Sequence, residues 1–250
     1  MKPDRCESLD AQMAVRIARI SQAHDALGLL ESWLDGWERD RAARFHFAED
    51  RARFILGRGL LRQCLSPWLD QAPETIRFSL TERDRPILAN DESLQFSLTH
   101  SHDLVAVALT ARARIGIDLE WMQAKNDLPG IAKRILSEAD HRAFLALSES
   151  EKVPAFFRIW TRKEAYLKAT GEGITDALQQ ISVSFGPEAT SSVRDSRHAP
   201  GAPAWSLFAL PVPPDYMGSV ACDAPDREVD CAFVRFDRGE LVDDTAPATG

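Results

Sequence analysis

Two short stretches of the sequence carry residue types that could do chemistry together. Trp160, Glu164 and Lys168 recur every four residues, so they share one face if their segment is helical. Asp118 and Glu120 lie two residues apart, so they point to one side of a strand. Because adjacent carboxylates repel unless a cation lies between them, and no His or Cys is nearby in sequence, the three carboxylates favour a Mg²⁺ site.

Each of these features also has an ordinary explanation. A Glu and a Lys one helical turn apart are most often a surface ion pair, and two acidic residues on a strand are most often a solvated face. His100, just after a predicted strand, is more often a structural hydrogen-bonding residue than a catalyst. The six arginines between Arg41 and Arg62 are either a solvated helix face or an anion-binding surface. The residues alone indicate Mg²⁺-assisted chemistry on a phosphate ester or anhydride, with the substrate left open.

Hydrophobic periodicity predicts the elements that would position these residues. We expect a strand over 115–121 and a helix over 152–169 that stops at Gly171. The other predicted strands are 13–20, 75–80, 94–98, 104–110, 181–185, 205–210, 217–222 and 229–236, and the other predicted helices are 25–34, 37–47, 50–65 (ended by Pro67), 129–135 and 137–147. The fold class is α+β, with subdomains 1–112 and 113–236, a loop at 186–204 and a flexible tail at 237–250.

Composition excludes several classes of function. The chain has 250 residues and a net charge of -8, which argues against nucleic-acid or anionic-membrane binding by its whole surface. Its four scattered cysteines predict neither disulfides nor a zinc site, and no signal-peptide or membrane-span pattern occurs, so we expect a cytoplasmic protein. No P-loop, dinucleotide fingerprint or Ser–His–Asp pattern is present.

Three motifs together resemble a known family. They are F-S-L-T-H-S at 96–101, I-G-I-D-L-E at 115–120 and F-F-R-I-W-T-R-K-E-A-Y-L-K-A-T-G-E-G-I at 156–174. Their order and spacing resemble the 4′-phosphopantetheinyl transferases of the two-domain, surfactin-synthetase-activating type, over roughly 41–185. The resemblance implies a pseudo-two-fold pair of α/β subdomains with the active site at their interface. It implies a holo-[acyl-carrier-protein] synthase that moves the phosphopantetheine arm of coenzyme A onto a carrier serine and releases adenosine 3′,5′-bisphosphate.

The resemblance also implies roles for particular residues. Glu49 stands where some relatives have an arginine that contacts coenzyme A, and Arg51 or Arg53 is expected to replace it. The expected Mg²⁺ ligands are Asp118, Glu120 and Glu164; the expected catalytic residues are Glu164, Lys168 and His100; and the expected coenzyme A contacts are Arg53, Arg83, Arg85, Thr99, His100, Asp118 and Lys168. Glu164 is expected to be the base, a metal ligand or both.

The implied partners are coenzyme A and an apo acyl or peptidyl carrier protein, with docking expected at 131–144 and just after Leu147. The implied enzyme is a monomer that binds neither nucleic acid nor membrane. Two alternatives stay open: an inactive relative that only binds coenzyme A or a carrier, and another Mg²⁺-dependent phosphotransferase. The carrier's pathway, whether fatty acid, polyketide or nonribosomal peptide, and a preference for free or acylated coenzyme A are also open.

Overall fold

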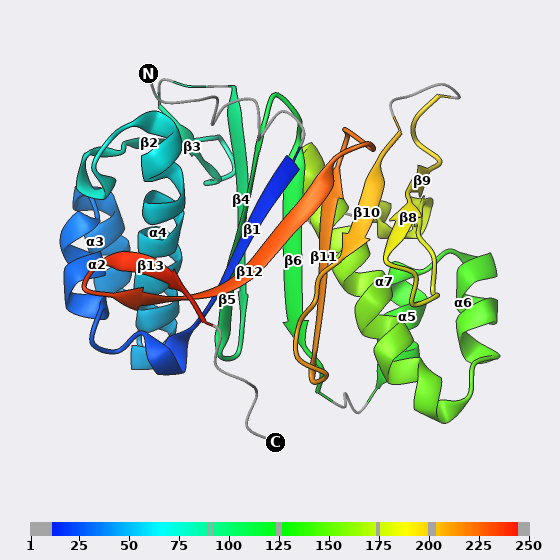
Figure 1. Cartoon of the computed structure of the whole chain (residues 1–250). Coiled ribbons are helices and arrows are strands. Elements are labelled where there is room, and N and C mark those ends of the chain that lie inside the picture. The colour runs from blue at the N-terminus through cyan, green and yellow to red at the C-terminus, as the bar shows by residue number, and fades with distance from the viewer. Residues whose placement is uncertain are drawn as a thin grey trace. The chain divides into compact units, whose positions relative to one another are not determined.

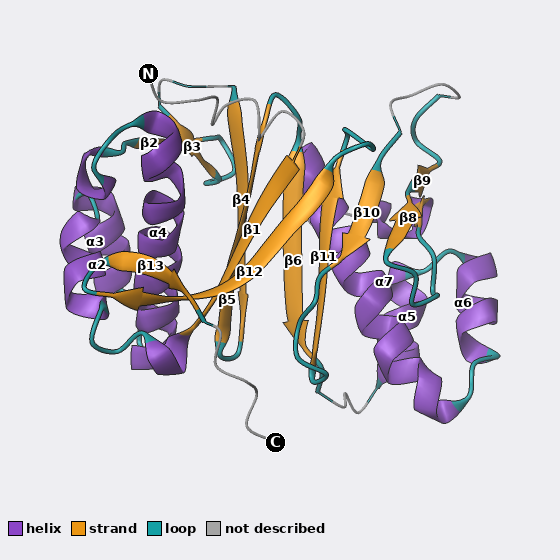
Figure 2. Cartoon of the chain, in the orientation of Figure 1, coloured by secondary structure: helices purple, strands orange, loops and turns teal. Residues whose placement is uncertain are grey.

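The computed structural model describes residues 12–244 apart from 90, 92, 124–126, 174–175 and 200–203. In this part the chain is mixed α/β (Figure 1, Figure 2) and divides into two compact units. Unit 1 is Met1–Arg112 with Glu228–Gly250, and unit 2 is Ala113–Arg227. The second unit ends at Arg227, and the chain returns to unit 1 at Glu228, whereas the predicted subdomains are 1–112 and 113–236.

A five-stranded sheet forms the centre of unit 1. Its middle strand β1 (Gln12–Arg19) pairs in parallel with β12 (Glu228–Asp237), which lies more than 200 residues later, whereas the other strand pairs of the sheet are antiparallel. The β5 strand (Leu104–Ala111) is buried along its whole length, as expected for an apolar run inside a sheet. The sheet order is β13 (Glu240–Asp243), β12 (Glu228–Asp237), β1 (Gln12–Arg19), β5 (Leu104–Ala111) and β4 (Leu94–Ser101). The β13 strand occupies the start of the predicted flexible tail, whose residues 245–250 lie outside the described part.

The helices of unit 1 lie on one side of this sheet (Figure 1). They are α2 (Leu27–Trp33), α3 (Gly36–Ala43) and α4 (Ala48–Leu69). Unit 1 also has single 3-10 turns at Ile20–Gln22 and Pro73–Thr75, and a hairpin of β2 (Phe78–Leu80) and β3 (Pro86–Leu88). The expectation that Pro67 ends the long helix is wrong, because α4 includes Pro67 and ends at Leu69, with Asp70 as its C-cap. A proline near a helix end removes one hydrogen bond but leaves the next residues free to complete the last turn, and Asp70 closes it in the left-handed conformation with φ 51°.

Unit 2 has a four-stranded antiparallel sheet. Its order is β6 (Ile115–Trp121), β11 (Tyr216–Cys222), β10 (Ser206–Ala209) and β8 (Thr190–Ser192), and a separate pair joins β7 (Ile181–Ser182) to β9 (Arg194–Asp195). The β6 strand has the predicted bounds. The predicted loop 186–204 instead contains β8 and β9, and its residues 200–203 lie outside the described part.

The helices of unit 2 are α5 (Leu128–Ile135), α6 (Glu138–Leu145), α7 (Glu149–Thr170) and the 3-10 helix η3 (Asp176–Gln180). Ser137 caps α6 by accepting a hydrogen bond from the Asp140 amide, as its sequence predicts. A capping box of Ser148 and Glu151 starts α7, and Gly171 ends it with φ 77°, a conformation in which glycine is favoured. No helix of the described part is long and apolar enough to cross a membrane.

Candidate functional site

A glycine sets the distance between the acidic strand and the long helix of unit 2. The β6 strand packs on α7, and Gly116 is the point of closest approach. A Cβ atom at Gly116 would lie 2.0 Å from the Ala165 carbonyl oxygen and 2.5 Å from the Ala169 amide nitrogen, which is far inside van der Waals contact. Because side chains alternate along a strand, Asp118 and Glu120 share the Gly116 face and point toward α7.

The helix meets these two carboxylates with two donors. Lys168 donates from Nζ to Asp118 Oδ1 at 2.7 Å and to the Ile117 carbonyl at 3.2 Å. Trp160 donates from its indole Nε1 to Glu120 Oε1 at 3.1 Å, and its ring stacks on Phe156 with centroids 6.4 Å apart. The predicted shared face of Trp160 and Lys168 is therefore present on α7, and the ion pair joins Lys168 to the strand.

Glu164 lies between these two donors along the helix and is 6% exposed. Its Oε1 atom is buried and has no hydrogen-bond partner among the described residues. Burial, reinforced by the negative charge of Asp118 and with a smaller effect of Glu120, raises the pKa of Glu164 to about 7, while Lys168 opposes the rise. A carboxyl group with this pKa can accept or donate a proton near neutral pH.

A cation fits the chemistry of this acidic set, because it would relieve the charge that raises the Glu164 pKa and would occupy a buried oxygen without a hydrogen bond. In the described part of the chain, no three Asp, Glu, His or Cys residues are grouped closely enough to hold one metal ion. The expected single coordination sphere of Asp118, Glu120 and Glu164 therefore stays a prediction.

In unit 1, the predicted coenzyme A residues Thr99 and His100 belong to β4. The expectation that His100 follows the end of a strand is wrong, because β4 continues to Ser101 and pairs His100 with Val105 of β5. Adjacent strand residues point to opposite faces, so the buried Thr99 and the exposed His100 lie on different faces of the sheet. His100 shares the face of Leu98, whose side chain lies against Gly57 of α4.

The structure brings Arg53 to the turn that follows His100. Arg53 donates from Nε to the His102 carbonyl at 2.9 Å and also pairs with Asp50. Arg51, the other candidate at this position, pairs instead with Glu31 at 2.5 Å. Of the two arginines, Arg53 is therefore the one placed beside the T-H-S-H segment.

The other two predicted arginines lie in the β2–β3 hairpin. Arg83 is exposed in its turn, and Arg85 donates from Nη2 to the Phe96 carbonyl at 3.2 Å. Burial lowers the pKa of Arg85 from its usual value. Arg85 lines a cavity of about 600 Å³ together with hairpin and β4 residues that include Pro86, Gln95 and Phe96.

The arginine-rich segment is only partly solvated. Arg62 is fully buried and makes a bidentate pair with the buried Glu38, at 3.1 and 2.6 Å, and the buried Arg58 lies 3.4 Å from the same carboxylate. The interpretation of the whole segment as a solvated helix face is therefore wrong for Arg58 and Arg62, which pack over the aromatic rings of Trp37 and Phe78.

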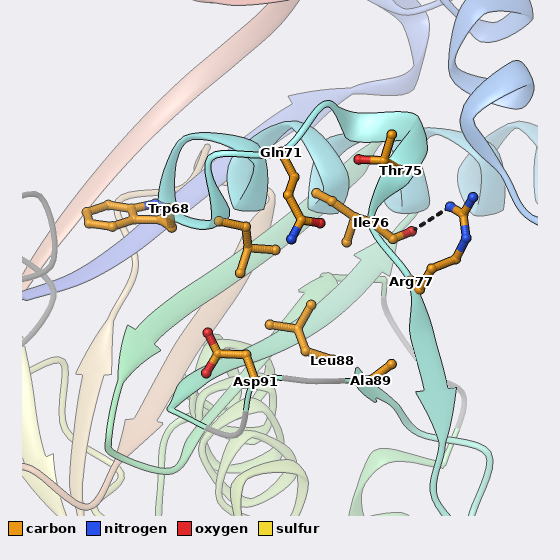
Figure 3. Close-up of a pocket in the computed structure, with 9 residues that line it drawn as sticks. Trp68, Gln71, Thr75, Ile76, Arg77, Leu88, Ala89 and Asp91 are labelled. Carbon is orange, nitrogen blue, oxygen red and sulfur yellow. Dashed lines mark hydrogen bonds between the residues drawn. The ribbon is translucent and has the colours of Figure 1, made fainter.

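A cavity of about 330 Å³ opens in unit 1 below the end of α4. Figure 3 shows Trp68, Gln71 and Leu88 around it, with Arg77 bonded to the Ile76 carbonyl at 3.2 Å. None of the predicted site residues lines this cavity. It is therefore separate from the residues that the motifs single out.

Sequence reasoning missed three features of the acidic site. The sequence placed Trp160 on the helix face but did not indicate that its indole donates to Glu120. Gly116 was noted only as part of a motif, and the hydroxyl groups of Thr161 and Ser219, 3.0 Å apart, join α7 to β11. The alternation Gly-x-Asp-x-Glu could have indicated Gly116, since it places a residue without a side chain on the acidic face.

On β6 and α7, Lys168 pairs with Asp118 beside the buried carboxyl group of Glu164. Charged groups of these kinds are ones that phosphoryl transfer uses. Comparison with known proteins agrees. Residues 114–221 match the 4′-phosphopantetheinyl transferase superfamily, and residues 21–112 match the 4′-phosphopantetheinyl transferase N-terminal family. The chain belongs to this superfamily and is a 4′-phosphopantetheinyl transferase.

Individual relatives carry the same name. The chain is 36% identical over 217 residues to 4′-phosphopantetheinyl transferase HetI of Nostoc sp. strain PCC 7120, covering 86% of this chain and 88% of the relative. It is 28% identical over 207 residues to 4′-phosphopantetheinyl transferase Sfp of Bacillus subtilis strain 168, covering 82% and 89%. It is 34% identical over 121 residues to 4′-phosphopantetheinyl transferase AcpT of Escherichia coli O157:H7, covering 48% and 58%.

Proposed function

We propose that this transferase moves the phosphopantetheine arm of coenzyme A to a serine of an apo acyl or peptidyl carrier protein, with Mg²⁺ as its cofactor. The observation that carries the proposal is the arrangement on β6 and α7, where Lys168 meets Asp118 beside the buried Glu164. These groups match the needs of phosphoryl transfer, which are positioning and neutralisation of charge.

Asp118, Glu120 and Glu164 are the proposed Mg²⁺ ligands. Bound Mg²⁺ supplies charge neutralisation at a pyrophosphate, and its preference for oxygen matches three carboxylates. Lys168 is already on the acidic face and would place its ammonium group beside the pyrophosphate. Trp160 holds Glu120 in one orientation through its indole N–H, so it acts as a positioning residue.

Glu164 is the proposed general base. Its buried carboxylate would take the proton from the carrier serine as the serine oxygen forms a bond to the β-phosphorus of coenzyme A. The bond between that phosphorus and the bridging oxygen breaks, and the electron pair leaves with adenosine 3′,5′-bisphosphate. Lys168 stabilises the negative charge that develops on the leaving phosphate.

Unit 1 would supply the contacts to the adenosine end of coenzyme A. Arg85 lines a cavity of about 600 Å³, and Arg83 lies in the same hairpin. Arg53 and His100 are proposed to face the 3′-phosphate, with Thr99 as a further contact. The pseudo-two-fold relation of the subdomains, an active site at their interface and a monomeric enzyme all stay predictions.

The carrier is proposed to dock on α5 and α6. Their outer surface exposes Lys133 and Arg134 near the end of α5, and Leu145 at the end of α6 is 46% exposed. The basic side chains at the end of α5 and this apolar side chain suit a partner helix that is acidic and partly apolar. Lys133 and Arg134 lie within the predicted docking range 131–144, and Leu145 lies one residue beyond it.

The test is transfer itself. The enzyme is mixed with an apo carrier, coenzyme A and Mg²⁺, and the carrier is weighed by intact-protein mass spectrometry. We expect a mass gain of one phosphopantetheine group, no gain on a carrier whose acceptor serine is replaced by alanine, and no gain after chelation of the metal. An enzyme that modifies no member of a panel of acyl and peptidyl carriers would contradict the proposal.

A further inference from the structure

A buried lysine next to Glu164 takes no part in the acidic site described above. Lys163 projects from a different side of α7, about 100° around the helix from Glu164, and is 0% exposed. Its Nζ donates to the Ile135 carbonyl at 2.6 Å and to the Leu178 carbonyl at 2.7 Å. Both partners are main-chain groups, so the ammonium is held by backbone and is not placed for substrate.

The first of these contacts is at the end of a helix. Ile135 is the last residue of α5, and the final carbonyls of a helix have no donor within the helix. A cation at this end also interacts favourably with the helix dipole. Lys163 therefore caps α5 from a different helix, and the cap ties α5 to α7.

Other polar contacts attach α5 and α6 to the rest of unit 2, but they come from elements other than α7. Gln179 of η3 donates to the Lys133 carbonyl at 3.1 Å, and Ser182 of β7 donates to Asp140 of α6 at 2.9 Å. Of these three polar contacts, the one from Lys163 originates on α7, one residue before Glu164. It links the end of the proposed docking helix to the helix that carries the proposed base.

We infer that Lys163 is a positioning residue for the carrier protein: it fixes the end of α5 relative to Glu164, so that a carrier docked on α5 and α6 presents its serine to the acidic site. This inference rests on the proposed function. Coenzyme A is proposed to bind elsewhere, to residues of unit 1 and to Lys168, so loss of Lys163 should affect the two substrates differently.

The experiment measures transfer kinetics of Lys163→Met with each substrate varied separately. We expect the loss of two hydrogen bonds from a buried cation to loosen the end of α5 and to raise the KM for the carrier about tenfold. The KM for coenzyme A and the kcat at saturating carrier should stay within about twofold. Calorimetric binding of a carrier with its serine replaced by alanine should weaken by the same factor as the KM rises.

Arg162→Met is the matched control. Arg162 is 1% exposed and, like Lys163, donates to backbone carbonyls, namely those of Ser184, Gly186 and Glu188. These residues follow β7 and do not belong to α5. Arg162→Met should lower stability without the selective rise in carrier KM.

Lys163→Gln retains one side-chain donor and serves if the methionine variant does not fold. It should show a smaller rise in carrier KM, together with faster hydrogen exchange in α5 than in the wild type. Equal changes in both KM values, a fall in kcat alone, or an unchanged carrier KM would overturn the inference. If the wild-type enzyme transfers nothing to any carrier, the proposed function fails. If the wild type is active but hydrogen exchange at α5 is unchanged in the Lys163 variants, only the positioning role of Lys163 fails.

Discussion

The indole Nε1 of Trp160 donates a hydrogen bond to Oε1 of Glu120 across the contact between α7 and β6, at 3.1 Å. Trp160→Phe keeps an aromatic ring for stacking on Phe156 but removes the donor. Because a hydrogen bond to a carboxylate contributes about 1.5–3 kcal/mol, we expect the Mg²⁺ concentration at half-maximal activity to rise roughly 10-fold or more. A Mg²⁺ titration of transfer measures this, and an unchanged midpoint would contradict a positioning role for Trp160.

Gly116→Ala should push the acidic strand away from α7. The added methyl would lie 2.0 Å from the Ala165 carbonyl oxygen, so the helix must shift or the fold must lose stability, by about 1–3 kcal/mol or more. Urea unfolding measures the loss, and activity should fall with it because the Asp118–Lys168 pair is displaced. Gly28→Ala is the control, since a methyl at this exposed helical position meets no atom within 4 Å.

Lys168→Met should reduce kcat more than it raises the KM for coenzyme A. The variant keeps the length of the side chain but removes the charge that would stabilise the leaving phosphate, and removal of one such group costs about 10²–10³-fold in rate. Steady-state kinetics with saturating carrier separate the two constants. A large rise in KM with an unchanged kcat would instead assign Lys168 to ground-state binding.

Glu38→Gln should destabilise unit 1 more than Arg62→Met does. Glu38 pairs with both buried arginines, so its loss leaves Arg58 and Arg62 as uncompensated buried cations, at a cost of about 3–5 kcal/mol. Arg62→Met leaves Glu38 still beside Arg58. Denaturant unfolding of both variants gives the order, and equal losses would contradict it.

Asp195 should contribute pH-dependent stability to unit 2. Burial would raise its pKa, but hydrogen bonds from Arg197 and Tyr166 outweigh burial and lower the pKa to about 2 from 3.8. The folded state therefore binds fewer protons than the unfolded state between these values, and the stabilisation is present above about pH 4 and disappears as pH falls through 2.

Asp195→Asn tests this pH dependence. At pH 7 it should lower the free energy of unfolding by about 1–2 kcal/mol. The difference in the free energy of unfolding between the variant and the wild type should shrink as the pH is lowered from 4 toward 2. Over this range the unfolded wild-type chain binds a proton at Asp195, and near pH 2 the folded protein binds it as well. Urea unfolding at a series of pH values measures the difference, and a constant difference would contradict the assigned pKa.

Local pattern predicted the parts of the site that lie within one element. The four-residue spacing of Trp160, Glu164 and Lys168 placed them on one helix face, and the Asp118–Glu120 alternation placed both carboxylates on one strand face. Pattern could not predict which partner each would meet. Lys168 is spaced to pair with Glu164 along the helix, yet packing at Gly116 brings it to Asp118 instead.

Errors in the predicted fold arose where distant segments decide the outcome. Residues 228–236 have a clear strand pattern, but nothing local says that their partner is β1. The pairing of Arg62 with Glu38 likewise joins two helices through buried side chains, which composition alone presents as a solvated basic segment. The position at which α4 ends could not be predicted from Pro67 alone, because a proline in the last turn of a helix does not stop the helix.

The parallel pairing of β1 with β12 has a consequence for synthesis on the ribosome. Unit 2 lies in the sequence between the two parts of unit 1. Its segment 113–227 is therefore synthesised before β12 and β13 of the unit 1 sheet. The acidic site on β6 and α7 can therefore assemble while β1 still lacks its neighbour on that side. A nascent chain stalled before Glu228 should protect unit 2 from protease while leaving the β1 edge open to pairing with other chains.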